Sequence, residues 1–256
     1  MNRILAFSDR NRKELLRDPL SYVFCLAFPL VMLVVMTLVD TSIPRESGMT
    51  VFHIQNLCAG IAVFGQLFVM LFTTLTVSKD RAGSFLVRLY ATPMTSTDFI
   101  IGYMLPMLVI CVLQSILIYA VSFVISFFTP DRLNPLGLIA SIPVLIPSAA
   151  MFIGFGMLFG SLFNDKAAPG VSSIIISLGS FLGGIWFDAD ATGGTMLDIC
   201  KALPVYYCTR SARAAVRLDF SPSACWIPLL IVTGCAILLI VLSSLAFRSR
   251  MKADLA

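Results

Sequence analysis

Charged residues are scarce in this chain of 256 residues: Asp, Glu, Lys and Arg make up only 12% of it, whereas hydrophobic residues make up 58%. This balance excludes an ordinary soluble domain, in which about a quarter of the residues are charged. The few charges fall between uncharged stretches of 20 or more residues. A helix of about 20 residues spans about 30 Å, the thickness of the hydrocarbon core of a bilayer. The stretches therefore predict helices that cross a membrane.

The uncharged stretches also lack the alternation of apolar and polar residues that marks the strands of a membrane β-barrel. A helix satisfies its own backbone hydrogen bonds and is the form expected in lipid. We therefore predict an all-α membrane protein, a single domain over residues 1–256 with six transmembrane helices. An interfacial helix precedes the first span, and a re-entrant or interfacial helical element precedes the last. The predicted spans are residues 20–39, 54–78, 99–128, 135–163, 167–187 and 222–247.

The distribution of Lys and Arg predicts the orientation. Six crossings place both termini on one side, and positively charged loops stay in the cytoplasm. With both termini inside, most of the 18 Lys and Arg residues fall in cytoplasmic segments. Four of those left outside lie in one long segment, residues 188–219, where the rule is weaker. We predict that both termini are cytoplasmic.

The six predicted spans contain no charged residue, and this absence restricts the mechanism. Ion-coupled carriers usually place ionisable side chains at membrane depth. The chain also has no nucleotide-binding loop of the Gly-x-x-x-x-Gly-Lys-Ser/Thr type, so energy must come from another polypeptide. His53 is the single histidine and the seven cysteines show no metal-ligand spacing, so no metal site is predicted. Cys200 and Cys208 either pair on the outer side or serve as small packing residues.

Uncharged polar side chains are the groups left inside the spans. Gln66, Thr73 and Gln114 are candidates for a translocation path. Such a path would suit an apolar or amphiphilic substrate better than a small ion. The alternative is that these side chains only make hydrogen bonds between helices.

Two cytoplasmic segments are candidates for contact with a partner. Residues 1–19 are polar and of mixed charge, and loosely spaced apolar residues favour an interfacial helix over a plain tail. In residues 79–98, charges at the start give way to Phe85 and Leu89 and then to a break at Thr92 and Pro93. This pattern predicts a short amphipathic helix that docks on a cytosolic protein, with a simple surface loop as the alternative.

Residues 188–219 are too long for a plain connector and too polar for another crossing. We predict two short helices there, separated at Pro204, which form a shallow re-entrant or interfacial pair. Arg210, Arg213 and Arg217 recur at i, i+3 and i+7 on one stripe, which we expect to face head groups or water. We expect Tyr206, Tyr207 and Val216 to lie at the membrane interface.

Several short motifs, in this order and at these distances from six spans, carry a resemblance to a known family. They are Lys13-Glu14-Leu15-Leu16-Arg17-Asp18-Pro19, Arg81-Ala82-Gly83, Ala91-Thr92-Pro93-Met94, Ile101-Gly102-Tyr103 and Leu203-Pro204-Val205-Tyr206-Tyr207. Over essentially its whole length the chain resembles the type-2 ABC transporter permeases, the membrane subunits of bacterial exporters of drugs, lipids, polysaccharides and peptides.

The resemblance implies roles for three segments. The leader would be a connecting helix, residues 79–98 would contain the coupling helix, and residues 188–219 would be the outer re-entrant element. The implied connecting-helix residues are Arg12, Lys13, Glu14, Arg17 and Asp18. The implied ATPase-coupling residues are Lys79, Asp80, Arg81, Gly83, Phe85, Arg88, Leu89, Thr92 and Pro93, and the implied outer residues are Pro204, Tyr206, Tyr207, Arg210 and Arg213.

The resemblance also implies partners and a location. The chain would not be an enzyme and would hold no cofactor, because ATP and Mg would bind to separate cytosolic ABC ATPase subunits. A second permease copy, identical or not, and membrane lipid would complete the assembly in the bacterial cytoplasmic (inner) membrane, and no nucleic acid is expected. Two other readings stay open: a non-transporting sensor or resistance module, and an ATP-independent channel or scramblase.

Overall fold

The computed structural model describes residues 2–44, 48–83, 85 and 94–254, and the described residues form helices and no strand. This confirms the all-α prediction. Two segments, η1 and η3, are single π-helical turns inside longer helices. In chain order the elements are α1 (Asn2–Arg17), α2 (Pro19–Tyr22), η1 (Val23–Ala27), α3 (Phe28–Ser42), α4 (Ile54–Ala82), α6 (Ser96–Ile125), α7 (Pro135–Leu162), α8 (Ala168–Leu182), α9 (Ala189–Thr192), α10 (Gly194–Lys201), α11 (Pro204–Val216), η3 (Pro222–Trp226) and α12 (Ile227–Asp254).

Within the described residues, 5 helices are long and apolar enough to cross a membrane. They coincide with the first four predicted spans and the last. The fifth predicted span, residues 167–187, corresponds to α8, which has only 15 residues. At 1.5 Å per residue such a helix is about 22 Å long, short of the hydrocarbon core. The sixth crossing therefore stays a prediction.

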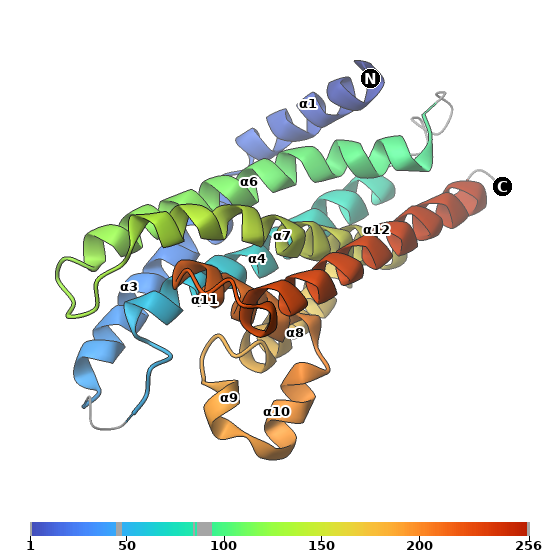
Figure 1. Cartoon of the computed structure of the whole chain (residues 1–256). Helices are drawn as coiled ribbons and strands as arrows, with labels where there is room; N and C mark the ends of the chain where they lie inside the picture. The colour runs from blue at the N-terminus through green and yellow to red at the C-terminus, as the bar shows by residue number, and fades with distance from the viewer. Residues whose placement is uncertain (1, 45–47, 84, 86–93, 255–256) are drawn as a thin grey trace.

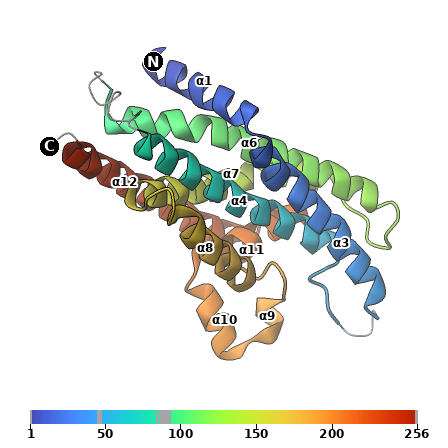
Figure 2. The same cartoon turned by 180° about the vertical axis from the view of Figure 1, so that it is seen from behind.

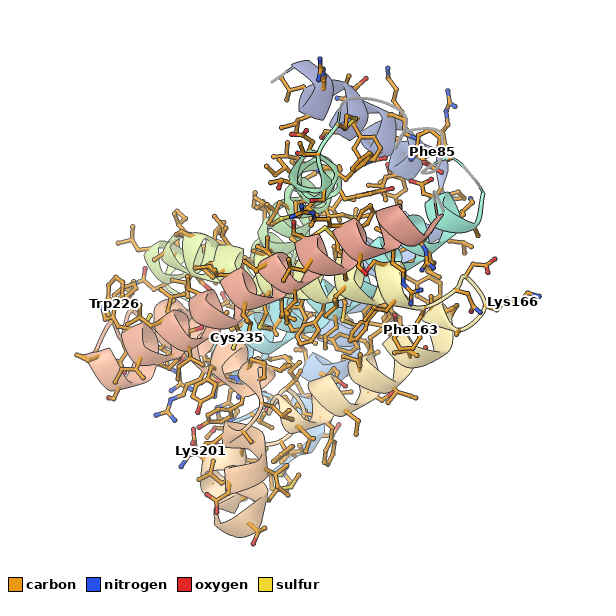
Figure 3. The ribbon with its side chains drawn as sticks, turned by 90° about the vertical axis from the view of Figure 1, so that its right-hand side faces the viewer. Phe85, Phe163, Lys166, Lys201, Trp226 and Cys235 are labelled. Atoms are coloured by element: carbon orange, nitrogen blue, oxygen red, sulfur yellow. The ribbon has the colours of Figure 1, made fainter. Side chains whose placement is uncertain are left out.

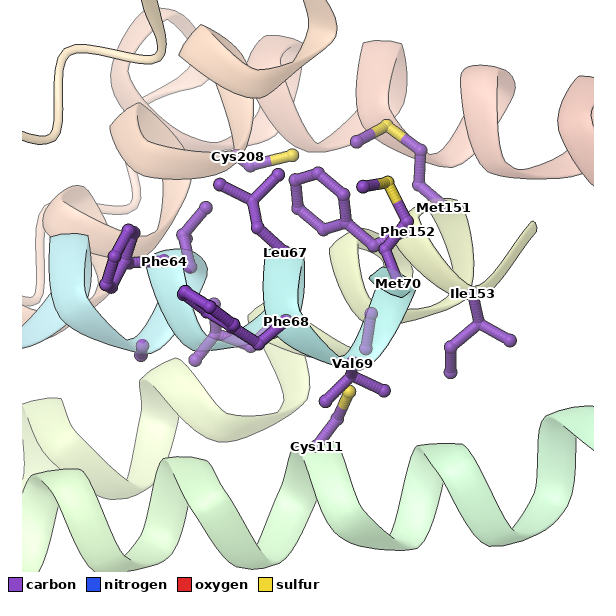
Figure 4. Packing of buried hydrophobic residues seen from close by; sticks show 14 of the residues in the cluster. Phe64, Leu67, Phe68, Val69, Met70, Cys111, Met151, Phe152, Ile153 and Cys208 are labelled. Carbon is purple, nitrogen blue, oxygen red and sulfur yellow. The ribbon is translucent and has the colours of Figure 1, made fainter. Parts of the chain in front are cut away.

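Helix α4 is the centre of the bundle. Of its most apolar window, 94% is buried inside the protein, against 17% for the segment α2–η1–α3, which lies at the periphery. Figure 4 shows Leu67 and Met70 of α4 packed toward Phe152 of α7 and Cys208 of α11, with Cys111 of α6 on the other side. Because α4 is enclosed by protein, its side chains decide how the surrounding helices fit together.

Close contact between α4 and α7 depends on two glycines of α7. A Cβ atom at Gly156 would lie 2.6 Å from the carbonyl oxygen of Met70, and one at Gly160 would lie 2.7 Å from Cβ of Val77. The two glycines are spaced as small-x-x-x-small, the spacing that lets helices approach closely in membranes. The two glycines therefore let the backbones of α4 and α7 come close together.

The termini and connections gather at two ends of the bundle. Both termini lie at one end, together with the end of α4 and the start of α6, whereas the α3–α4 and α6–α7 connections lie at the opposite end (Figures 1 and 2). We call these the inner and outer ends, following the predicted orientation. Helices α9 and α10 project sideways from the bundle, and α11 returns to pack against α4, α7 and α12.

Candidate functional site

A charged cluster at the inner end joins α1 to α4 and α6. Arg10 donates two hydrogen bonds to the Asp80 carboxylate, with Nη1–Oδ2 and Nη2–Oδ1 distances of 2.6 and 2.9 Å. The hydroxyl of Tyr103 donates to the same carboxylate at 2.7 Å. Asp80 is buried, and a buried carboxylate needs such partners because it has lost its water. Burial works against the charge of Arg10, but the bonds to Asp80 outweigh it and raise the pKa of Arg10.

The same guanidinium also contacts the start of the predicted coupling segment. The Cζ atom of Arg10 lies 4.0 Å from the centre of the Phe85 ring, a cation–π contact. Figure 3 labels Phe85 beside α1. Arg10 therefore links α1, the end of α4 and the beginning of the connection to α6. A displacement of Phe85 would reach α1 through Arg10.

The rest of the predicted coupling set is dispersed. Lys79 is exposed, and Arg81 Nη1 donates to the carbonyl oxygen of Ser161 at 2.5 Å, which joins the inner ends of α4 and α7. Gly83 caps the C-terminus of α4. Residues Arg88, Leu89, Thr92 and Pro93 lie outside the described residues. The coupling roles stay predictions, although Asp80 faces inward rather than toward a partner.

The predicted connecting helix is α1, and it is fixed along α6. The ring of Phe7 packs directly on Gly102: a Cβ atom at Gly102 would lie only 2.4 Å from the ring of Phe7. Phe7 also makes edge-to-face contacts with Phe99 and Tyr103, with distances between ring centres of 5.5 and 4.9 Å. Asn11 donates to the carbonyl oxygen of Gly102 at 3.2 Å. The Ile101-Gly102-Tyr103 motif is therefore part of the surface against which α1 packs.

The exposed side of α1 carries most of the implied connecting-helix residues. Arg12 and Lys13 pair with Asp9 at 2.5 and 2.7 Å and face solvent. The Oε2 atom of Glu14 lies 2.7 Å from Nη2 of Arg10. Asp18 caps α2, because its side chain accepts a hydrogen bond from the N–H of Leu20. Arg10 and Phe7 were not among the predicted site residues, and Tyr103 was named only as part of the Ile101-Gly102-Tyr103 motif. The signal available for α1 was the i, i+4, i+8 spacing of its buried Phe7, Asn11 and Leu15.

A groove of about 780 Å³ opens beside this cluster, between the α1–α2 junction, α4 and α8. Its inner part is charged and its deeper part is apolar. Phe68 lies eleven residues before Lys79 on α4, which places it about 16 Å deeper at 1.5 Å per residue. Phe24 and Phe72 line the deep part together with Phe68, and Ser173 and Ser177 of α8 line the facing wall. The charged lining residues are Glu14, Arg17, Asp18 and Lys79.

The predicted translocation residues do not line this groove. Gln66, Thr73 and Gln114 are fully buried within the protein. Gln66 donates to the carbonyl oxygen of Leu145 at 3.2 Å and accepts from Ser148 at 2.6 Å. Thr73 bonds back to its own helix, and Gln114 bonds across to Ala62. The structure favours the alternative reading, hydrogen bonding within and between helices, and a role in transport stays a prediction.

The outer element is held by α11. Tyr206 donates to Asp190 at 2.6 Å and accepts from Arg210 at 2.7 Å. Burial and the bond to Asp190 raise the pKa of Tyr206 to about 12. Pro204 begins α11, and Tyr207 donates to the carbonyl oxygen of Lys201. All seven cysteines, Cys200 and Cys208 included, are free thiols.

The arginine stripe of α11 is divided in the structure: Arg217 is exposed, as the sequence predicted, whereas Arg210 and Arg213 are half-buried. Arg213 is half-buried and turned toward α4 and the turn after α8, and Tyr206 and Val216 are buried. Helix α11 packs against α4, α7 and α12, so Arg213 meets the backbone carbonyl oxygens of Asn56 and Ile185. Arg210 instead meets Asp190 and Tyr206, and Arg217 meets the side chain of Asn56.

Two comparisons with known proteins bear on this arrangement. A protein-family model described as ABC-2 type transporter matches residues 2–216, from α1 to the end of α11. The match covers well over half of the chain and both the inner cluster and the groove. No curated protein matches the chain.

Proposed function

The chain belongs to the ABC-2 type transporter family, and on that premise we propose that it is the membrane subunit of an exporter powered by a separate ATPase. The substrate is an apolar or amphiphilic molecule taken up from the inner leaflet or the cytosol. The observation that carries this proposal is the groove between α1–α2, α4 and α8. Its charged inner rim and apolar depth suit a molecule with a polar head and an apolar body.

The inner cluster supports the proposed coupling. Arg10 contacts Asp80 of α4 and the ring of Phe85, so movement imposed on the connection after α4 by an ATPase would be transmitted to α1 and the groove rim. The chain has no nucleotide-binding loop of its own. In this proposal ATP and Mg bind to the partner ATPase, and the ATPase docks near Phe85.

The assembly contains two ATPase subunits and a second permease copy, identical or not. The groove is open on one side, and a second copy facing it would enclose a path between the two. Helix α8 and the residues that follow it form the sixth crossing, and both termini face the cytoplasm of a bacterial cell whose inner membrane holds the complex. The charge-free spans support a path for amphiphiles rather than for ions.

The test is reconstitution. The chain is co-expressed with a candidate ABC ATPase from the same organism, purified in mild detergent and placed in liposomes, and ATP-dependent movement of a fluorescent amphiphile is measured. The control is the same ATPase with its nucleotide-binding lysine replaced. We expect transport only with the active ATPase. Equal movement by the isolated chain without nucleotide would identify a channel or scramblase, and a folded chain that retains no ATPase would identify a non-transporting module.

A further inference from the structure

A second cavity lies toward the outer end and takes no part in the function proposed above. It has a volume of about 340 Å³ and lies between the start of α4, the turn after α8 and helix α11. We call it the arginine cup, because Arg210, Arg213 and Arg217 all line it. Three carboxylates, Asp188, Asp190 and Asp219, line it as well.

One of the three arginines is paired with an acidic residue. Arg210 lies 3.5 Å from the carboxylate of Asp190 and donates to Tyr206, so its charge is matched. The other two acidic residues are engaged with backbone: Asp188 accepts from the N–H of Ala191 and Asp219 accepts from the N–H of Ser221. These two carboxylates cap local turns.

The remaining two guanidiniums meet neutral acceptors. Arg213 Nε donates to the carbonyl oxygen of Asn56 at 3.2 Å and its Nη2 to that of Ile185 at 3.5 Å. Arg217 donates to the side-chain oxygen of Asn56. Among the residues that the structure describes, no carboxylate oxygen lies within 4.0 Å of either guanidinium. Asn56 therefore holds two cations side by side at the edge of one cavity.

Within the described part of the chain, neither of these two guanidiniums is paired directly with a carboxylate. Burial lowers the pKa of Arg213 to about 10; Asp188 and, more weakly, Asp190 oppose this shift, whereas the neighbouring Arg217 adds to it. Arg213 is half-buried, and a half-buried cation in a membrane protein normally faces a counter-ion or a functional ligand; Arg217 beside it is exposed. Guanidinium groups have the fork geometry that binds phosphate or carboxylate oxygens with paired hydrogen bonds. The free volume beside them is large enough for such a group.

We propose that the arginine cup binds an anionic group of the phosphate class, held between Arg213 and Arg217. Two sources share this chemistry: the head group of an anionic phospholipid and a free phosphate ion. The site is defined by contacts within this chain. Only its placement on the outer side rests on the proposed orientation, so the site stands even if the transport function fails.

The experiment measures thermal unfolding of the full chain in neutral detergent or in nanodiscs, because a ligand that binds the folded state raises the unfolding midpoint. Trp186 follows Ile185, a direct partner of Arg213, and its fluorescence serves as a local second readout. One arm titrates inorganic phosphate in detergent. The other compares nanodiscs of phosphatidylglycerol with nanodiscs of phosphatidylcholine.

The decisive variant is Arg217→Gln, because Arg217 is exposed and can be changed with little risk to folding. Lys201→Gln is the matched control: it removes one positive charge from the same outer segment, on α10 and outside the cup (Figure 3). We expect the apparent affinity for the stabilising anion to fall about ten-fold in Arg217→Gln, the loss of one charge-assisted contact. Lys201→Gln should keep the apparent affinity of the unchanged protein, and Arg217→Lys should retain part of that affinity.

The outcomes separate cleanly. Stabilisation by inorganic phosphate identifies a free-anion site, and stabilisation by phosphatidylglycerol alone identifies a lipid site. If neither ligand stabilises the chain, or if Arg217→Gln and Lys201→Gln respond equally, the proposal is overturned. In Arg213→Gln, where that variant folds, the apparent affinity for the anion should fall further. The test of the proposal rests on Arg217→Gln alone.

Discussion

Arg10 and Asp80 stand 70 positions apart in the sequence, yet two hydrogen bonds of 2.6 and 2.9 Å join their side chains. The contact fixes α1 to the inner end of α4, the most buried of the long helices. It also brings Arg10 over Phe85, at the start of the segment expected to meet an ATPase.

Breaking this ion pair should destabilise the protein and impair coupling. Asp80→Asn keeps an acceptor for Tyr103 but removes the negative charge beside Arg10. We expect a loss of about 1.5–3 kcal/mol in the free energy of unfolding, as for hydrogen bonds to charged groups. Substrate-stimulated ATP hydrolysis in the reconstituted complex should fall as well, even below the temperature at which the variant unfolds.

The matched control is Asp9→Asn, on the solvent-facing side of α1, whose carboxylate pairs with Arg12 and Lys13. It should leave both the unfolding midpoint and the ATPase stimulation unchanged, because exposed pairs contribute little. Equal effects of the two substitutions would contradict a special role of the buried pair.

Filling the α4–α7 contact should separate the two helices. In Gly156→Ala the new Cβ atom would lie 2.6 Å from the backbone oxygen of Met70, and backbone cannot easily move aside. We expect a destabilisation of about 1–3 kcal/mol, measured by thermal unfolding in detergent. Gly234→Ala in α12, where a Cβ atom would meet nothing within 4 Å, should be neutral. A harmless Gly156→Ala would show that the helices are less tightly packed than described.

Obstructing the groove should block transport without unfolding the chain. Ser177 is exposed on α8 and lines the groove, so Ser177→Trp places a large ring where the substrate is expected. We expect at least a several-fold loss of ATP-dependent transport, with the unfolding midpoint unchanged. Leu178→Trp, at the next position and outside the groove lining, is the control and should retain transport. Full transport by Ser177→Trp would show that the groove is not part of the translocation path.

The two buried glutamines should respond differently to loss of their amide groups. Gln66 uses both ends of its amide, whereas Oε1 of Gln114 is buried and has no hydrogen-bond partner among the described residues. Replacing Gln66 by Met, which has a similar shape, should destabilise the protein by about 1–3 kcal/mol. Gln114→Met should be milder, because it also removes an unsatisfied oxygen.

For Gln66→Met and Gln114→Met, both the unfolding midpoint and the transport per folded molecule are measured. If both residues only support the fold, transport per folded molecule stays normal in each. A selective loss of transport with an unchanged unfolding midpoint would instead restore them as candidates for the translocation path.

Some of the architecture is a local property of the chain and was predictable. Uncharged runs of about 20 residues predict helices that cross lipid, and the first four runs and the last are helices long and apolar enough to do so. The close contact of α4 with α7 also depends on a local feature, because the absence of side chains at Gly156 and Gly160 is visible in the sequence itself. The family resemblance rested on motifs that are likewise continuous in sequence, and the family model confirms it.

What the sequence determined by itself is therefore which segments prefer lipid, because that preference is a sum over neighbouring residues. The tertiary structure decided which polar groups meet: Asp80 turns inward to Arg10, Gln66 bonds to α7, and Arg213 faces a cup beside Asn56. Such pairings depend on which helices lie side by side and how each is rotated. A buried charge is stable only where a distant segment supplies its partner, and no local pattern records that segment.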